Sequence, residues 1–302
     1  MSLLVLHPGT YSLLVDRGRP KTRSFGIPFG GAADVAAFQI GNALLGNNPN
    51  AVALEITLSG PMLQAECDLS CCIFGGPFAI RAGNRSIGAG RVFTLRQSDI
   101  LTIGGSRTGA RGYLCVRGGF HSRQVLNSGT AFQPLAEGVR ISCVASSGQG
   151  RSLEHPDIDA LFGEKAGTMR VIDGPQADWF LTQRFYQQTF TVSPASNRMG
   201  IRLRGDAILR DPRELISEAV APGAIQITNE GLPIVLGVDG QTIGGYPKIA
   251  HVIRADLDRL GQLRPGQSVR FEKIDLELAE ELAAIRQGKL KRWLASLRVF
   301  AD

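Results

Sequence analysis

Residues 232–250 read Leu232-Pro-Ile-Val-Leu-Gly-Val-Asp-Gly-Gln-Thr-Ile-Gly-Gly-Tyr-Pro-Lys-Ile-Ala250 and carry a strand into a polar turn. The run 232–238 is mostly apolar and has the length of a strand. Asp239 is therefore expected at a strand end. The side chains after it place an amide, a hydroxyl, a phenol and an ammonium around the same turn. This density of polar groups beside a strand end favours a functional site.

Two glycines and a proline shape the turn. Gly244 and Gly245 permit positive φ and a close approach of the backbone to a ligand, and Pro247 fixes the chain that leads into Lys248. The alternative interpretation is a hairpin whose glycines serve geometry alone.

The composition is that of a folded protein rich in turns. The chain of 302 residues contains 37 glycines, 14 phenylalanines and 4 tyrosines, which favours aliphatic strands linked by many turns. It is long enough to bury a large core in one or two domains. No apolar run reaches membrane-spanning length, and Leu3-Leu-Val-Leu6 is too short for a signal-peptide core, so we expect neither export nor membrane insertion.

Charge and cysteine content argue against two further classes. The formal net charge is +6, but the basic residues are scattered except near 17–23 and 289–292, which disfavours nucleic-acid binding. The five cysteines form no C-x-x-C pair and the four histidines show no paired spacing, so neither a metal site nor a disulfide framework is indicated. We expect a reduced, cytoplasmic protein in which Cys71 and Cys72 are buried thiols of a strand.

Short strands with Gly-rich turns recur in both halves of the chain, as in a barrel or sandwich. Glu55 interrupts one apolar strand and is expected to face water, because strand alternation predicts one polar face. The predicted strands are 3–6, 12–15, 51–58, 62–66, 69–74, 78–81, 91–95, 99–103 and 112–117 in the first half, and 169–172, 189–193, 201–204, 214–218, 224–227, 233–238 and 268–272 in the second.

Helical patterns occupy residues 32–45 and 275–298. Asp34 in the first helix suits the positive end of the helix dipole. The second helix has glutamates near its start, basic residues near its end and an apolar face, so it would cap the fold or dock a partner. A polar, Gly-rich linker is predicted at 146–157. The organisation we expect is two subdomains, 1–150 and 168–275, followed by helix 275–298.

The loop from Asp16 to Gly31 carries four basic residues and is a candidate cradle for an anion, with a solvated surface loop as the alternative. The chain has no phosphate loop, no nucleophile elbow and no H-E-x-x-H helix, which disfavours the mechanisms built on those motifs. It also has no biotin attachment segment, so biotin, if used, would come from another protein or domain.

Several segments together resemble the carboxyltransferase-domain family that contains the C subunit of 5-oxoprolinase, allophanate hydrolase subunit 2, the antagonist KipA and part of the urea carboxylase carboxyltransferase domain. The resemblance spans nearly all of 1–302. It rests on segments in the family's order: Val15-Asp-x-Gly-Arg19, Gly26-Ile-Pro-x-Gly-Gly-Ala-x-Asp34, Ala53-Leu-Glu-x-Thr-Leu-x-Gly-Pro61, Gly174-Pro-Gln176, Ser196-Asn-Arg-Met-Gly200, 239–250 and Leu263-Arg-Pro-Gly266.

The resemblance implies a mainly β fold of two cyclophilin-like β-barrel subdomains with a few short helices and a C-terminal helix. It also implies work in a complex with a KipI-like partner, similar to the B subunit of 5-oxoprolinase. The chemistry implied is ATP-dependent opening of 5-oxoproline to glutamate, with ATP bound in the complex. As alternatives, the chain would be a biotin-dependent carboxyltransferase acting on urea or a related amide, or a non-catalytic KipA-like antagonist that binds a KipI-like regulator.

The leading hypothesis, a 5-oxoprolinase subunit, assigns roles to the motif residues. Asp239 or Asp34 would handle protons, and Lys248 and Arg19 would hold an anionic or phosphorylated intermediate. The sequence leaves open which carboxylate is the base. Tyr246 and Gln241 would orient the amide. The remaining substrate-binding candidates are Asp16, Gln176, Arg198, Thr242, Gly244 and Gly245.

Three departures from the family pattern keep the antagonist alternative open. Lys21 stands where the family usually has Gly, Asn127-Ser-Gly-Thr130 replaces a Gly-Ser-Arg-Ser-Thr segment, and Gly240 replaces an Arg. Lys21, Arg23 or Arg254 would be the replacements for the lost positive charge.

The resemblance also predicts how the site meets its partner. Loops 16–31 and 239–250 are expected to line one shared cleft against the partner protein. Apolar side chains in these loops would anchor the interface. The candidate anchors are Phe25, Phe29, Ile243 and Tyr246, and Phe29→Asp is expected to weaken partner binding while leaving the chain folded.

Overall fold

The computed structural model describes residues 1–147, 153 and 167–299, and the chain divides into two compact units. The first unit comprises the described residues of Met1–Gly18, Asp34–Gly163 and Lys289–Asp302. The second comprises those of Arg19–Ala33 and Glu164–Gly288. Most of the predicted linker at 146–157 lies outside the described residues.

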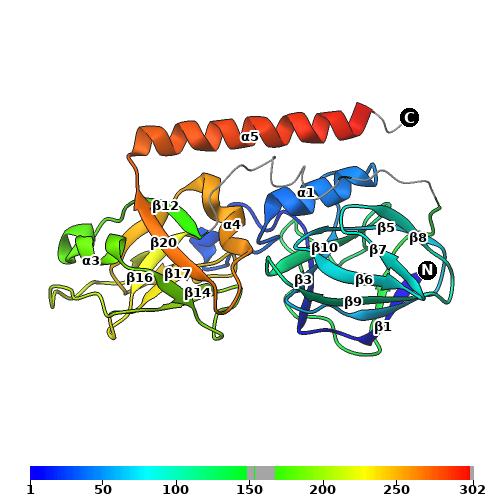
Figure 1. Ribbon diagram of the computed structural model, residues 1–302, viewed down its shortest axis with the longest axis horizontal. Coiled ribbons are helices and arrows are strands. Elements are labelled where there is room, and N and C mark those ends of the chain that lie inside the picture. Colours follow the sequence, from blue (N-terminus) through cyan, green and yellow to red (C-terminus); the bar gives the residue numbers. More distant parts are fainter. Residues whose placement is uncertain (148–152, 154–166, 300–302) are drawn as a thin grey trace. The chain divides into compact units, whose positions relative to one another are not determined.

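The first unit is built from two antiparallel sheets (Figure 1). One sheet has the order β11-β1-β4-β9-β6-β7 and the other β2-β3-β10-β5-β8. The strands are β1 (Ser2–His7), β2 (Tyr11–Val15), β3 (Ala53–Thr57), β4 (Met62–Ala65), β5 (Leu69–Gly75), β6 (Phe78–Ala82), β7 (Arg85–Ile87), β8 (Val92–Leu95), β9 (Ile100–Ser106), β10 (Arg111–Val116) and β11 (Arg140–Ser142).

One apolar core joins the two sheets of the first unit. Leu3 and Leu63 come from the first sheet and Ile56 and Leu114 from the second, and all four are buried in the same cluster. Alternate residues of each strand point to one face, which is why short aliphatic strands suffice to fill this core. The predicted buried thiols are confirmed, since Cys71 and Cys72 lie in β5 with no exposed surface.

Glu55 does not face water, so its predicted orientation was wrong. It is fully buried in β3, where Oε1 lies 3.3 Å from Nε of Arg111 and Oε2 accepts a hydrogen bond of 2.9 Å from the Tyr113 hydroxyl. Strand alternation failed here because both partners lie on the neighbouring strand β10 and compensate the buried carboxylate. Burial and the nearby Glu55 charge raise the pKa of Tyr113.

The second unit is a closed barrel of seven strands in the order β12-β19-β16-β17-β14-β13-β20, which confirms the mainly β prediction. Its aromatic core packs Phe185, Phe190 and Phe271, with the rings of Phe185 and Phe271 stacked 4.8 Å apart. The strands are β12 (Thr168–Asp173), β13 (Phe190–Val192), β14 (Gly200–Arg204), β16 (Ala224–Ile227), β17 (Pro233–Leu236), β19 (Lys248–Val252) and β20 (Ser268–Lys273), with a separate ribbon of β15 (Glu218–Ala219) and β18 (Ile243–Gly244).

The turn after β17 is not a hairpin. β17 and β19 lie on opposite sides of β16 and are not hydrogen-bonded to each other, so residues 237–247 cross past β16 before β19 begins. The hairpin interpretation is therefore wrong. The crossing places Lys248 at the first position of a barrel strand.

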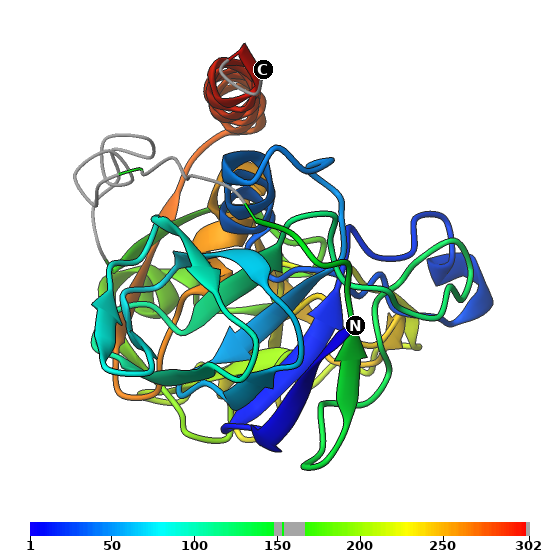
Figure 2. The same ribbon diagram turned by 90° about the vertical axis from the view of Figure 1, so that its right-hand side faces the viewer.

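The helices of the described residues are few. They are α1 (Val35–Leu44), which packs on β5 and β10, α3 (Thr182–Gln187), α4 (Leu257–Gly261) and α5 (Leu276–Val299), with short 3-10 turns η1 (Arg23–Phe25), η2 (Ala177–Trp179) and η3 (Arg254–Asp256). The predicted C-terminal helix is confirmed as α5, seen from the side in Figure 1 and nearly end-on in Figure 2. Arg286 of α5 pairs with Asp258 of α4 at 3.1 Å. None of the described helices is long and apolar enough to cross a membrane.

Candidate functional site

Two motif segments that are distant in sequence meet on strand β19. The Gly174 N–H donates to the Ile249 carbonyl at 2.9 Å, and a Cβ on Gly174 would lie only 2.3 Å from the Lys248 carbonyl oxygen. Only glycine therefore fits this approach. The close packing brings the Gln176 side chain beside Lys248.

The Lys248 cluster consists of Lys248, Glu218 and Gln176. Nζ of Lys248 donates to Oε1 of Glu218, and Nε2 of Gln176 donates to the same oxygen at 2.8 Å. Gln176 Oε1 accepts from the Lys248 backbone N–H at 3.1 Å. The Lys248 side chain is only 3% exposed, whereas that of Glu218 is 39% exposed. The ammonium is therefore buried beneath a carboxylate that reaches the surface.

Charges in and beside this cluster shift the pKa of two groups. The hydrogen bond from Lys248 lowers the pKa of Glu218, desolvation opposes it, and Gln176 adds to the lowering. Burial and the Lys248 charge lower the pKa of His251, which lies further along β19. Glu218 is consequently ionised and His251 neutral at neutral pH.

Gly244 and Gly245 do not have positive φ, so that part of their prediction was wrong. Gly244 is needed for space instead: a Cβ there would lie 2.6 Å from Nε2 of Gln241 and 2.7 Å from Nε2 of Gln226. Two amide groups therefore occupy the place of the missing side chain. Nε2 of Gln226 also donates to the Tyr246 carbonyl at 3.2 Å.

Asp239 is held by Arg198 rather than by Lys248. Arg198 Nε donates to Oδ2 of Asp239 at 2.7 Å, Nη2 donates to Oδ1 at 3.0 Å, and Nη2 also donates to the Gly31 carbonyl at 2.7 Å. The predicted residues Asp239 and Arg198 are thus brought together. Asp239 and Lys248 take part in different ion pairs.

The loop 19–31 makes hydrogen bonds to the segment that follows β17, whereas the shared cleft expected of loops 16–31 and 239–250 stays a prediction. The Gly30 N–H donates to the Val238 carbonyl at 2.9 Å. The Arg23 guanidinium donates to the carbonyls of Val220 and Gln241, the latter at 3.4 Å, and burial lowers its pKa. Arg19 is buried, and its backbone N–H donates to the Phe29 carbonyl at 2.7 Å.

Asp16 and Asp34 belong to the first unit, where each carboxylate holds local structure. Asp34 caps α1 by accepting from the Ala37 N–H at 2.9 Å. The substrate and catalytic roles of these two residues stay predictions. The Asp16 carboxylate accepts four hydrogen bonds, from Gly18 N at 2.8 Å, Ser128 Oγ at 2.6 Å, Gly129 N at 2.6 Å and Thr130 Oγ1 at 2.7 Å.

The remaining candidates and departures occupy varied places. The Thr242 carbonyl accepts from the Val220 N–H at 3.0 Å, and Tyr246 is partly exposed. Lys21 has φ of 65°, a conformation that glycine adopts with less strain. A Cβ on Gly240 would lie 2.9 Å from the Gly237 carbonyl oxygen, so an arginine there would require the backbone to move.

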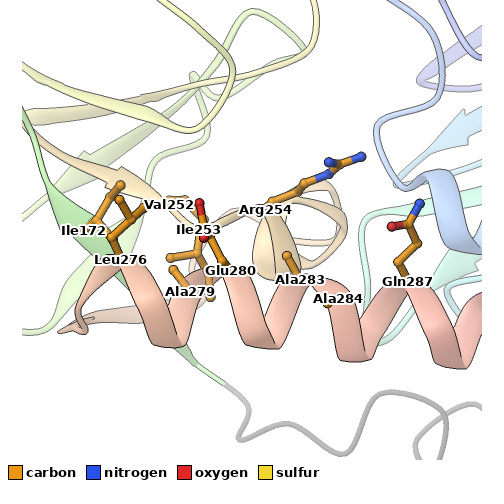
Figure 3. Close-up of a pocket in the computed structure, with 10 residues that line it drawn as sticks. All are labelled: Ile172, Val252, Ile253, Arg254, Leu276, Ala279, Glu280, Ala283, Ala284 and Gln287. Carbon is orange, nitrogen blue, oxygen red and sulfur yellow. The ribbon is translucent and has the colours of Figure 1, made fainter.

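A separate groove of about 460 Å³ runs between α5 and the barrel, and one wall is a face of α5 (Figure 3). Apart from Arg254, it contains none of the residues considered for the site. Arg254 is thus part of the groove wall. Among the described residues, no three His, Cys, Asp or Glu side chains gather as metal ligands.

Sequence reasoning missed Glu218 and Gln226. Glu218 is the last residue of the predicted strand 214–218, but the structure has only the two-residue strand β15 there. No motif contains Glu218. Gln226 carried a usable signal, because it is the single polar residue of the apolar strand Ala224-Ile-Gln-Ile227 and is 2% exposed. A polar side chain buried in a strand needs a partner, which points to a site.

Comparisons with known proteins show the family to which the chain belongs. The model of the carboxyltransferase domain, subdomain A and B, matches residues 25–273. The C subunit of 5-oxoprolinase from Haemophilus influenzae is 34% identical over 287 residues, covering 92% of this chain and 93% of that protein. The corresponding C subunit from Escherichia coli is also 34% identical, over 292 residues with the same coverage. The crystal structure of the K. lactis urea amidolyase matches with a TM-score of 0.86 and 25% identity, over 97% of this chain and 20% of that one. The chain therefore belongs to the carboxyltransferase-domain family of subdomains A and B.

Proposed function

We propose that this chain is the C subunit of an ATP-hydrolysing 5-oxoprolinase complex that opens the cyclic amide 5-oxoproline to glutamate. A KipI-like protein, similar to the B subunit of 5-oxoprolinase, is its proposed partner. Likeness over nearly the full length of two proteins named as C subunits of 5-oxoprolinase supports the assignment. The observation that carries it is the Lys248 cluster. Two family motifs contribute to it, since Gln176 comes from one and Lys248 from another.

The cluster suits a small amide. An amide offers one carbonyl oxygen, which accepts hydrogen bonds, and one N–H, which donates. The site provides an ionised carboxylate on Glu218 and the side-chain amides of Gln176, Gln226 and Gln241. Fixed donors and acceptors of this kind orient an amide and stabilise charge that develops on its oxygen.

The cluster does not suit a triphosphate. Among the described residues of the cluster, Lys248 is the one cation, and Glu218 already neutralises its charge. The sequence also has no phosphate loop. A nucleotide triphosphate is normally cradled by several backbone N–H groups and cations. We therefore place the ATP in the rest of the complex, and Asp239 with its partner Arg198 stays a predicted contributor to proton handling.

The experiment reconstitutes the chain with its partner subunits and measures ATP-dependent glutamate formation from 5-oxoproline. Lys248→Met should lower kcat/KM by about 100-fold or more, the scale of losing one electrostatic group of a site. Lys273→Met is the matched control, because Lys273 is an exposed lysine that also pairs with a carboxylate, that of Asp173. Equal activity in both variants would remove the support of the Lys248 cluster.

The structural match to the urea amidolyase favours one second candidate, a biotin-dependent carboxyltransferase. When a biotin-carrying protein in its carboxylated form is added to the reconstituted system, transfer of its carboxyl group to urea that avidin inhibits would establish that alternative. A complex that forms but has neither activity would favour the antagonist function.

A further inference from the structure

Glu218 is the solvent-exposed member of the ion pair with Lys248, although the family motif contains Lys248 and not Glu218. Lys248 is almost fully buried and Glu218 is not. A ligand that approaches from solvent therefore meets the Glu218 carboxylate before it meets the ammonium. The buried cation acts on such a ligand chiefly through Glu218.

The two carboxylate oxygens of Glu218 are in different situations. Oε1 receives both the Lys248 ammonium and the Gln176 amide. Among the described residues, the hydrogen bonds to this carboxylate all go to Oε1 and none goes to Oε2. An ionised carboxylate oxygen is a strong acceptor. Oε2 is thus available for a donor brought by a ligand.

The backbone fixes where this oxygen stands. Glu218 pairs with Gly244 across the ribbon of β15 and β18, so the acid lies opposite the glycine of the family motif. The same glycine makes room for the amide groups of Gln226 and Gln241. Acceptor and amide groups therefore lie around one short ribbon, within a single unit of the chain.

We propose that Glu218 is a catalytic residue of this site, whose Oε2 accepts a hydrogen bond from the amide N–H of the substrate, while Lys248 is a positioning residue that holds the carboxylate from below. This inference rests on the proposed function and names the group that recognises the amide. It reverses the expected roles, because the lysine does not touch the substrate. The substrate class is a small amide that carries an N–H, such as a lactam.

The test compares 5-oxoproline with the lactone in which a ring oxygen replaces the N–H. Dissociation constants of both compounds are measured for the reconstituted complex without ATP. The wild-type complex should bind the lactam about 10- to 100-fold more tightly, the scale of one hydrogen bond to a charged group. Glu218→Gln should weaken binding of the lactam by that factor and change the dissociation constant of the lactone by no more than about twofold. Glu230→Gln, at an exposed acid of the same unit, should change neither.

A measurement on the chain alone checks the positioning role without activity. NMR titration of glutamate-labelled chain should show the pKa of Glu218 below its ordinary value of 4.5 in the wild type and raised in Lys248→Met. Glu218→Asp, which keeps the charge but shortens the side chain, should bind the lactam more tightly than Glu218→Gln does.

The outcomes separate the two proposals. Suppose that the complex turns over 5-oxoproline, but Glu218→Gln weakens binding of the lactam and the lactone equally or weakens neither. The role of Glu218 is then overturned and the proposed function stands. An unchanged Glu218 titration in Lys248→Met overturns the positioning role of the lysine. If the wild-type complex binds neither compound, the substrate assignment fails, and the recognition role of Glu218 fails with it.

Discussion

The guanidinium of Arg198 donates two hydrogen bonds to the carboxylate of Asp239, of 2.7 Å from Nε to Oδ2 and of 3.0 Å from Nη2 to Oδ1. Arg198 is nearly buried, and it also donates to the Gly31 carbonyl. The pair therefore ties the end of β17 both to the 196–200 motif and to the loop 19–31. A buried bidentate pair holds such segments in one geometry.

Asp239→Asn should destabilise the chain, because it leaves the buried arginine without its carboxylate. We expect a loss of about 2–4 kcal/mol in the free energy of unfolding, near the lower end for buried pairs because Asp239 is partly exposed. Urea unfolding measures the change. The control is Asp211→Asn, which breaks an exposed pair with Arg213 and should cost less than about 1 kcal/mol. Similar losses in both variants would contradict the anchoring role.

His251 should make the stability of the chain depend on pH in the acidic range. Its pKa in the folded chain lies below the ordinary 6.5, so between the two values the unfolded chain binds more protons. The free energy of unfolding therefore rises with pH across that window and levels off above about 6.5. Glu218 acts at lower pH, since its folded pKa is below 4.5 and its contribution is lost as the pH falls through that folded value.

His251→Gln isolates this effect. Urea unfolding between pH 5 and 8 should show a flatter profile for the variant than for the wild type, with the two approaching a constant difference above the ordinary histidine value. Parallel profiles over the whole range would show that His251 does not carry the pH dependence.

The sequence predicted much of the secondary structure because its strands are short, aliphatic and separated by glycine-rich turns. It could not predict the path after β17, because strand order in a barrel depends on pairings between distant segments. For that reason the sequence places Lys248, the first residue of β19, in a turn. The motif contains Lys248, but Glu218 comes beside it only through the two-residue pairing of β15 with β18, which no sequence pattern predicts. Glu55 failed for a related reason, since its compensating partners on β10 are remote in sequence.

Asp16 should stabilise the first unit through the segment 128–130. Its carboxylate accepts hydrogen bonds from Ser128, Gly129 and Thr130, all within 2.7 Å. Asp16→Ala should lower the free energy of unfolding by about 2–3 kcal/mol, because several charge-assisted hydrogen bonds are lost together. Ser128→Ala should cost about 1 kcal/mol alone and much less in the Asp16→Ala background. Additive losses in the double variant, measured by urea unfolding, would show that the two residues act independently.

Phe25 should be an anchor for the partner protein. It is 79% exposed, whereas Phe29, the other phenylalanine of the loop, is half-buried. Phe25→Asp should therefore leave Tm unchanged. It should weaken partner binding more than tenfold, the typical effect of losing an apolar anchor at an interface. Phe132→Asp is the matched control, because Phe132 is 62% exposed and belongs to the first unit.

Isothermal titration of each variant with the proposed partner, the KipI-like protein, measures the change in affinity. We expect weaker binding for Phe25→Asp and wild-type binding for Phe132→Asp, since Phe25, unlike Phe132, lies on the loop that contacts the segment after β17. The opposite pattern would move the interface to the first unit. That outcome would contradict the anchoring role of Phe25.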